Sequence, residues 1–484
     1  MHTFQIICQK LIENNFWSFK ITFKIIIVLV RIERVKSEFE LVFHVTCHYL
    51  LTNQDPLLES KSLATVDTNT SNASKIDPNS IFDHYVPAES GVFGTFRVLL
   101  NTAIGSGTLM VPYCFTSGVG TALIISFFFA CLAYASLLLL IDSSQYCHEY
   151  DYQGLFAYCF GKNRLWILNM VIFFVQYGTV MIYCHWLGRL MNKIVNLDYV
   201  SFIFNSNAFW ISTLTAFCVF PLTIFREISA LQNFTYFSLF FMLILIIHAL
   251  YFFIYDVTNE GFDPDGKLEF FAFSKYDVII SALSINALAY HCHLNLFSCL
   301  EHLQNCTLKR SHSLCGAVVV ACFILYNLFG LFSYLNLFDR LQAGSSLEYY
   351  PHPNWLTTVT TAGILVVLIV SSPLMNWSCR LSINNLIWKD KPMTNLRWIT
   401  ISGVICLSAA FLASSSEKIR LFFNIFGGLL MPVIEFMLPA LFFLKTNNGQ
   451  GSLIRKIFAG FLVVFAVLAM IACTYQAVVD IIKD

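Results

Sequence analysis

Charged residues are scarce in this chain. Asp, Glu, Lys and Arg make up 12% of its 484 residues, about half of the roughly 25% that is usual in soluble proteins. Hydrophobic residues make up 57%, and they gather in repeated runs of about 20 residues, the length of a helix that crosses a bilayer. The composition therefore excludes a soluble globular protein and predicts an all-α polytopic membrane protein embedded in a lipid bilayer.

The sequence also lacks an excess of charge of either sign and a paired cysteine motif. Its formal net charge is zero, so it offers no basic surface for nucleic acid. Its 16 cysteines are scattered, with no Cys-x-x-Cys pair, which leaves no redox or metal motif. No nucleophile motif accompanies the histidines, so we expect a protein that is not an enzyme and needs no cofactor.

The apolar runs predict about eleven transmembrane helices after an N-terminal segment, residues 1–90. We place this segment in the cytosol, because Lys and Arg are then more frequent in the inner loops. We expect it to be partly disordered, because residues 52–90 are rich in Ser, Thr and Asn. The transmembrane domain covers residues 91–480. Its expected spans are 93–115, 119–141, 165–188, 208–225, 231–254, 278–299, 314–338, 355–377, 398–414, 419–444 and 457–480.

The first span contains a break where a continuous helix would be expected. Gly105-Ser106-Gly107 lies at its centre, and glycine weakens a helix. Inside a bilayer, unpaired backbone groups are tolerated only where they line a cavity or bind a ligand. Close helix packing through small residues is the alternative. The residues expected to bind the substrate are Thr102, Gly105, Ser106 and Gly107. The backbone N–H groups around Gly105–Gly107 suit a carboxylate, while the backbone carbonyls and the side-chain oxygens of Asn101 and Thr102 suit a small cation.

The sixth span is unusually polar, since residues 281–295 hold two Ser, two Asn and two His. Polar side chains in a span are expensive unless they face a cavity or partners. We expect Ser284 and Asn286 to contact the substrate. His291 and His293 are two residues apart, so on a continuous helix they point to different faces, which argues against a metal site. We expect His291 to be a packing residue and His293 to act at a gate.

Two further positions could couple an ion to transport. Ser371 and Ser372 precede a proline in the eighth span, where hydroxyls could complete a sodium site with Asn101; alternatively, each serine bonds to its own helix. Glu435 lies between two prolines in the tenth span. A carboxylate there could carry a proton or bind a cationic substrate; alternatively, it pairs with a basic residue. The expected ion-coupling residues are Asn101, Ser371 and Glu435, with Na⁺ possible at the first two.

The breaks in spans one and six are five spans apart, which is typical of an inverted repeat with a site at the midplane. The same residues resemble the amino acid/auxin permease family. The resemblance implies a LeuT-type fold, with two five-helix inverted repeats, broken helices 1 and 6, and one final helix. The segments that carry it, within residues 88–480, are Asn101–Tyr113, Tyr290–Glu301, Ser371–Arg380 and Pro439–Phe442.

The resemblance also implies amino acid transport by alternating access, coupled to protons or sodium. Sodium-coupled members hold the ion with an Asn in the first span, which Asn101 matches, and a hydroxyl residue in the eighth, which Ser371 is near. Glu435 departs from the family's small, Ser/Thr-rich pattern and keeps proton coupling open. The alternative is an amino acid sensor of the same fold that signals through its N-terminal segment. We expect a monomer in the plasma membrane or in a vacuolar or lysosomal membrane.

Overall fold

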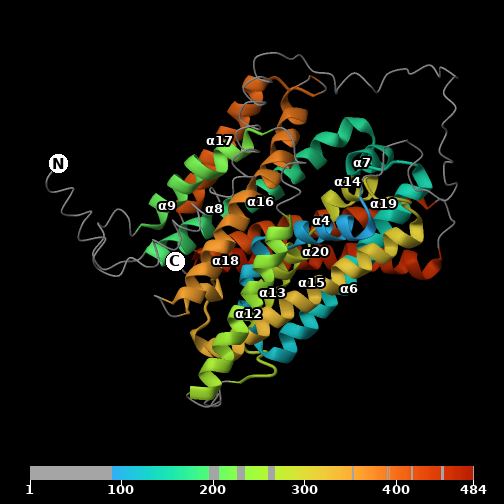
Figure 1. The fold of residues 1–484 in the computed structure, drawn as a ribbon. Coiled ribbons are helices and arrows are strands. Elements are labelled where there is room, and N and C mark those ends of the chain that lie inside the picture. Colours follow the sequence, from blue (N-terminus) through green and yellow to red (C-terminus); the bar gives the residue numbers. More distant parts are fainter. Residues whose placement is uncertain are drawn as a thin grey trace. The chain divides into compact units, whose positions relative to one another are not determined.

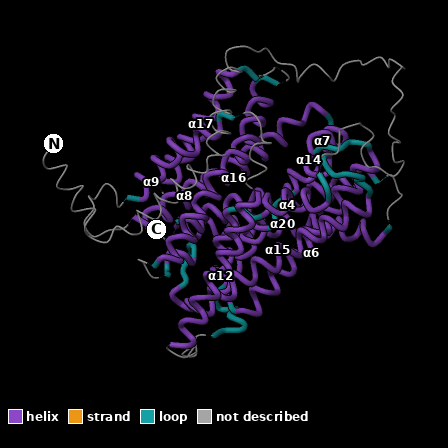
Figure 2. Tube along the Cα trace, in the orientation of Figure 1, coloured by secondary structure: helices purple, strands orange, loops and turns teal. Residues whose placement is uncertain are grey.

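The computed structural model describes residues 90–195, 206–225, 235–259, 268–350, 354–389, 391, 393–415, 418–447 and 452–482. These residues form helices and loops (Figure 2), with a single isolated bridge between Ser90 and Leu303. The chain divides into two compact units, one of residues 1–75 and 351–362 and one of residues 76–350 and 363–484. The described part of the first unit is the beginning of α16 (Trp355–Ile387). The site lies in the second unit. The predicted N-terminal segment, residues 1–90, falls almost entirely outside the described residues.

The predicted spans have helical counterparts in the described part of the chain. Eight helices are long and apolar enough to cross a membrane, and a bent pair makes a ninth. A shorter apolar stretch, Asn207–Thr223, and the interrupted sixth span complete the set. The eight are α6 (Val119–Cys147), α8 (Leu165–Val195), α12 (Thr235–Asn259), α15 (Leu308–Leu337), α16, α17 (Asn395–Ser414), the segment Ile419–Thr446 and α20 (Leu453–Ile482).

The first span is broken at the glycines, as predicted. α4 (Val92–Ala103) ends before Gly105, whose backbone is extended at φ −130° and ψ −152°. The chain continues in a 3-10 turn, η1 (Ser106–Met110), then in α5 (Val111–Cys114) and η2 (Phe115–Ser117). The two halves meet at an angle of 55°. Proline is tolerated near the start of α5 because the first turn of a helix has no partner for that N–H.

The sixth span is broken as well, but later than its polar residues suggested. α13 (Tyr276–Ala289) runs through Ser284 and Asn286 without interruption. The chain leaves the helix at residues 290–292 and resumes in η6 (His293–Asn295) and α14 (Leu296–Glu301). The freed backbone groups of this span therefore lie beside the histidines, and not beside Ser284.

The tenth span is widened over much of its length. After α18 (Ile419–Phe422) it forms two π-helical segments, η9 (Phe423–Leu430) and η10 (Val433–Met437), before α19 (Leu438–Thr446). π-Helical turns are rare and often occur at functional sites. A Cβ on Gly427 would lie 2.5 Å from the carbonyl oxygen of Ser284. Glycine is therefore required here for η9 to pack directly on α13.

The helices around the two breaks pack into one core. α12 packs on α15, α15 packs on α6, and α13 packs on η9 (Figure 1). α20 packs on η9 and α13 as well. Large apolar side chains remain exposed on α12 and α20, for example Phe240, Leu243, Val464 and Leu468. Apolar exposure on long apolar helices fits contact with lipid. One short helix, α7 (Tyr152–Phe160), lies between α6 and α8 in the chain.

Candidate functional site

The two broken helices meet at their interruptions. A Cβ on Gly107 would lie 2.9 Å from both the Cα and the N of Ala289, the last residue of α13. Such a distance to backbone atoms is too short for any real Cβ, so only glycine allows the two breaks to approach this closely. The hydroxyl of Tyr326, on α15, lies 2.9 Å from the carbonyl oxygen of Ala103 and 2.9 Å from that of Ala289. Tyr326 therefore joins the ends of α4 and α13.

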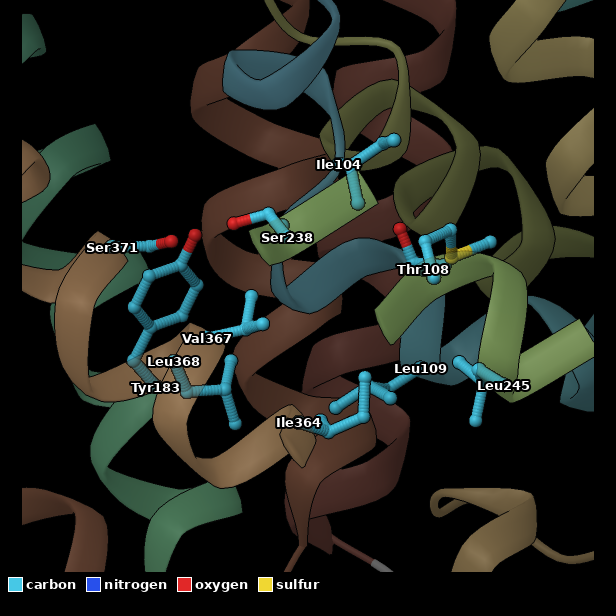
Figure 3. A pocket seen from close by; sticks show the side chains of 12 residues that line it. Ile104, Thr108, Leu109, Tyr183, Ser238, Leu245, Ile364, Val367, Leu368 and Ser371 are labelled. Atoms are coloured by element: carbon cyan, nitrogen blue, oxygen red, sulfur yellow. The ribbon is translucent and has the colours of Figure 1, made fainter. Parts of the chain in front are cut away.

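A small pocket lies beside the break in the first span. Figure 3 shows the hydroxyls of Tyr183, Ser238 and Ser371 pointing toward one another on one side of it, with Thr108 on another. Gly105 lines the pocket, and a Cβ there would lie 2.7 Å from the Tyr183 hydroxyl. The remaining wall is apolar, and its residues are Ile104, Leu109, Met242, Leu245, Ile364, Val367 and Leu368.

The pocket is smaller than an amino acid. Its cavity volume is about 20 Å³, and about 10–15 Å³ of cavity volume holds one water molecule. In this arrangement of the helices, the pocket has room for an ion or for one or two waters. A larger ligand would need the surrounding helices to separate.

The residues predicted in the first span have different surroundings. Asn101 is buried, and its Oδ1 has no hydrogen-bond partner among the described residues. Thr102 donates its hydroxyl to the carbonyl of Leu99 at 2.7 Å, so it is satisfied within its own helix. Gly105 lines the pocket, and Gly107 touches the end of α13. For Ser106, the structure describes the backbone alone.

Ser284 and Asn286 do not line the pocket. The Ser284 hydroxyl lies 2.8 Å from the Ser281 carbonyl and 2.8 Å from Oδ1 of Asn424 in η9. The Asn286 amide donates to the Ala282 carbonyl at 2.8 Å. Both side chains are satisfied inside the helix or by the tenth span, because α13 is intact where they occur. Their role in substrate binding stays a prediction.

The two neighbouring serines in α16, Ser371 and Ser372, have different surroundings. Ser371 lines the pocket, as expected of a residue that faces an ion. Ser372 donates to the carbonyl of Leu368 in its own helix at 2.7 Å, which is the alternative considered for both serines. The two neighbours thus provide a matched pair for experiments.

Glu435 and the two histidines of the sixth span lie together. Nδ1 of His291 is 3.1 Å from Oε1 of Glu435, and all three side chains are buried. The expectation that His291 is a packing residue stays a prediction, and the structure adds that its ring contacts a buried carboxylate. The expectation of divergent histidines assumed a continuous helix, whereas the chain is not helical at residues 290–292. The rings of His291 and His293 are 6.2 Å apart at 24°. The gating role of His293 stays a prediction.

One polar network was not found from the sequence. Arg420, in α18, lies 3.0 Å from Asp277 of α13 and 2.6 Å from Asp480 of α20. It also lies 3.2 Å from the hydroxyl of Tyr113 in α5. Asn424 donates to the same Asp480 at 3.2 Å. The network links α5, which follows the break in the first span, to α13, which precedes the break in the sixth. It therefore holds these two segments in place.

Comparison with known proteins decides the family. The family described as "Transmembrane amino acid transporter protein" matches residues 88–479. The chain belongs to this family. The resemblance carried by the broken spans and the serine-proline segment is thereby confirmed, and so is the expectation that the protein is a membrane transporter and not an enzyme.

The curated relatives are distant but cover most of the transporter region. Vacuolar amino acid transporter 5 of Schizosaccharomyces pombe is 25% identical over 80% of this chain and 94% of its own length. Amino acid transporter AVT6D of Arabidopsis thaliana is 24% identical over 76% of this chain and 88% of its own. Mouse solute carrier family 38 member 10 is 19% identical over 82% of this chain, and the match spans 37% of that longer protein.

Solved structures confirm the fold class. MhsT in complex with L-phenylalanine superposes with a TM-score of 0.55 at 14% identity, covering 80% of this chain and 98% of that one. A Na⁺-coupled sialic acid symporter gives a TM-score of 0.51 at 14% identity, covering 81% of this chain and 90% of that one. The chain thus has the predicted LeuT-type fold, with its first and sixth helices broken.

Proposed function

We propose that this protein is a secondary active transporter that moves amino acids across a membrane by alternating access, coupled to sodium or protons. The observation that carries the proposal is the meeting of the two broken helices at Gly107 and Ala289. Broken helices whose ends converge near the midplane are the sites where transporters of this architecture bind charged substrates. Membership of the amino acid transporter family supports an amino acid as the substrate.

The amino acid carboxylate would meet the backbone N–H groups around Gly105 and Gly107, since α4 ends at Ala103 and leaves this stretch outside a regular α-helix. Unpaired N–H groups bind anions well in a low-dielectric setting. The small pocket implies that the substrate enters when the helices lining it separate. Tyr183 and Gly105 are the residues that such a movement would uncover.

Two coupling schemes each rest on an observation. For sodium, Oδ1 of Asn101 is a buried oxygen without a hydrogen-bond partner among the described residues, and Ser371 lines the pocket. Such oxygens suit a small hard cation. For protons, Glu435 is fully buried beside His291, and an ionised carboxylate in a bilayer interior is costly.

The test is uptake of a panel of labelled amino acids into proteoliposomes at two pH values, with and without sodium. Sodium coupling predicts that Ser371→Ala abolishes sodium-dependent uptake, while Ser372→Ala, its neighbour, leaves it unchanged. Proton coupling predicts sodium-independent uptake that follows the pH gradient and is lost on Glu435→Gln. Ligand binding without flux under any gradient would refute transport and favour the sensor.

The membrane in which the protein acts is a further part of the proposal. We propose the plasma membrane or a vacuolar or lysosomal membrane, with the N-terminus in the cytosol, because this orientation concentrates Lys and Arg on the inner side. We also propose a monomer. Fluorescence microscopy of a tagged chain, with protease protection of tags at either end, tests the membrane and the orientation.

A further inference from the structure

Three buried side chains from two spans converge at the break in the sixth helix. His291, His293 and Glu435 each offer one ligand atom, and these atoms all lie within 4.8 Å of one another. His293 and Glu435 have no exposed surface, and His291 is 8% exposed. Neither histidine nor glutamate is placed in a membrane interior without cost. The cluster therefore requires a physical reason beyond packing.

The local backbone explains why the three can meet. α13 ends at Ala289 and η6 begins at His293, so the two histidines are carried by non-helical chain and can turn to the same side. Glu435 projects from η10, the π-helical segment of the tenth span. A π-helical turn displaces its side chains from their usual positions. The non-helical stretch at residues 290–292 and the π-helical turns of η10 together bring the three side chains into one cluster.

The hydrogen bonds of His293 fix its free nitrogen. The Ser136 hydroxyl lies 3.0 Å from the Ala133 carbonyl oxygen and 2.7 Å from Nε2 of His293. Nε2 is thereby held by a hydrogen bond. Nδ1 has no hydrogen-bond partner among the described residues and is the nitrogen open to a ligand. A histidine held in this way through its other nitrogen is the usual arrangement of a metal ligand.

The other two members of the cluster also have unused ligand atoms. Nε2 of His291 and Oε2 of Glu435 have no hydrogen-bond partner among the described residues. Buried polar atoms without partners cost about 1–3 kcal/mol each. The His291 nitrogen that faces Glu435 is Nδ1, 3.1 Å from Oε1, so a cation shared by the three side chains would bind this nitrogen and replace that contact. The same cation would give Nδ1 of His293 a partner and balance the carboxylate.

We propose that His291, His293 and Glu435 form a binding site for a divalent transition-metal ion of the zinc type. Two imidazoles and one carboxylate are a donor set that zinc accepts, with a fourth position left for water or another ligand. Calcium takes six to eight oxygen ligands and magnesium keeps an octahedral shell of oxygens, so both are disfavoured. The proposal does not rest on the transport function proposed above, and it reverses the expectation drawn from histidine spacing.

The test is metal binding to the purified full-length chain in detergent. The protein is stripped with a chelator and titrated with Zn²⁺ against a fluorescent chelator of known affinity. The wild type should bind one zinc more tightly than the variants His291→Ala, His293→Ala and Glu435→Gln, each of which should lose that equivalent or weaken it at least tenfold. Because the chain has 12 His and 16 Cys, the difference between variants is measured, and not the total zinc bound.

Two controls separate metal binding from folding. His185→Ala removes another buried histidine, in α8, and should leave the zinc equivalent intact. His293→Cys restores a zinc ligand and should recover binding that His293→Ala loses. Co²⁺ should give a visible absorption band with the wild type that weakens in the three variants. Zinc affinity equal to that of the wild type in all three variants, or no recovery with His293→Cys, overturns the proposal. Zinc binding by a chain that shows no uptake would refute the transport function alone.

Discussion

Replacing Tyr326 with Phe tests whether one hydroxyl holds the two broken helices together. The hydroxyl lies 2.9 Å from the carbonyl oxygens of Ala103 and Ala289, and Phe keeps the ring while removing this contact. A buried acceptor left unsatisfied costs about 1–3 kcal/mol, and hydrogen bonds inside membrane proteins average about 0.6 and reach about 1.7 kcal/mol. We therefore expect the arrangement in which the two breaks are in contact to lose about 1–2 kcal/mol.

This loss of free energy changes the kinetics of uptake if the two breaks move apart during transport. A bias of about 1–2 kcal/mol between two conformations changes their ratio roughly 5- to 30-fold. Tyr326→Phe should therefore lower the unfolding temperature in detergent and change the initial rate and KM of uptake in proteoliposomes. The matched control is Tyr177→Phe, which removes a hydroxyl that donates to Ser408 at 3.0 Å on α17, away from the breaks. A Tyr326→Phe protein with wild-type rate, KM and unfolding temperature would refute the bridge.

Three further predictions concern other contacts. Gly107→Ala should abolish uptake, because its Cβ would lie 2.9 Å from backbone atoms of Ala289. The control is Gly460→Ala, whose Cβ would meet no atom within 4 Å and which should transport normally. Normal uptake by Gly107→Ala would contradict the close approach of the two breaks. Ser136→Ala should weaken zinc binding by about 10- to 100-fold through loss of the His293 partner, and unchanged affinity in the chelator titration would show that Ser136 does not position the ring. Burial raises the pKa of the Cys159 thiol, in α7, to about 11. Because the thiolate is the reactive form, the rate of maleimide labelling at Cys159, measured by peptide mass spectrometry, should rise with pH up to about pH 11. A labelling rate that levels off near pH 9, the ordinary pKa of a thiol, would contradict the burial.

The spans and the first break could be predicted because each rests on local chemistry. Long apolar runs must be helical in a bilayer, and Gly105 and Gly107 weaken a helix wherever they occur. Tyr326 could not be found in this way. It stands in an apolar span, where an aromatic residue looks like any packing residue, and its partners lie 223 and 37 residues away in the chain. The pairing of His291 with Glu435 is hidden for the same reason, since 144 residues separate them.

The prediction for the sixth span shows which polar residues in a membrane helix indicate a site. The polarity of Ser284 and Asn286 predicts a role in substrate binding, but α13 is intact around them and supplies carbonyls at 2.8 Å to both. Short polar side chains can satisfy themselves against their own helix at little cost, so polarity alone does not require a cavity. Histidine and glutamate are larger and reach beyond their own backbone, and the three in this cluster keep atoms without partners among the described residues. A side chain that its own helix cannot satisfy, placed where the helix is interrupted, is therefore the stronger sign of a binding site.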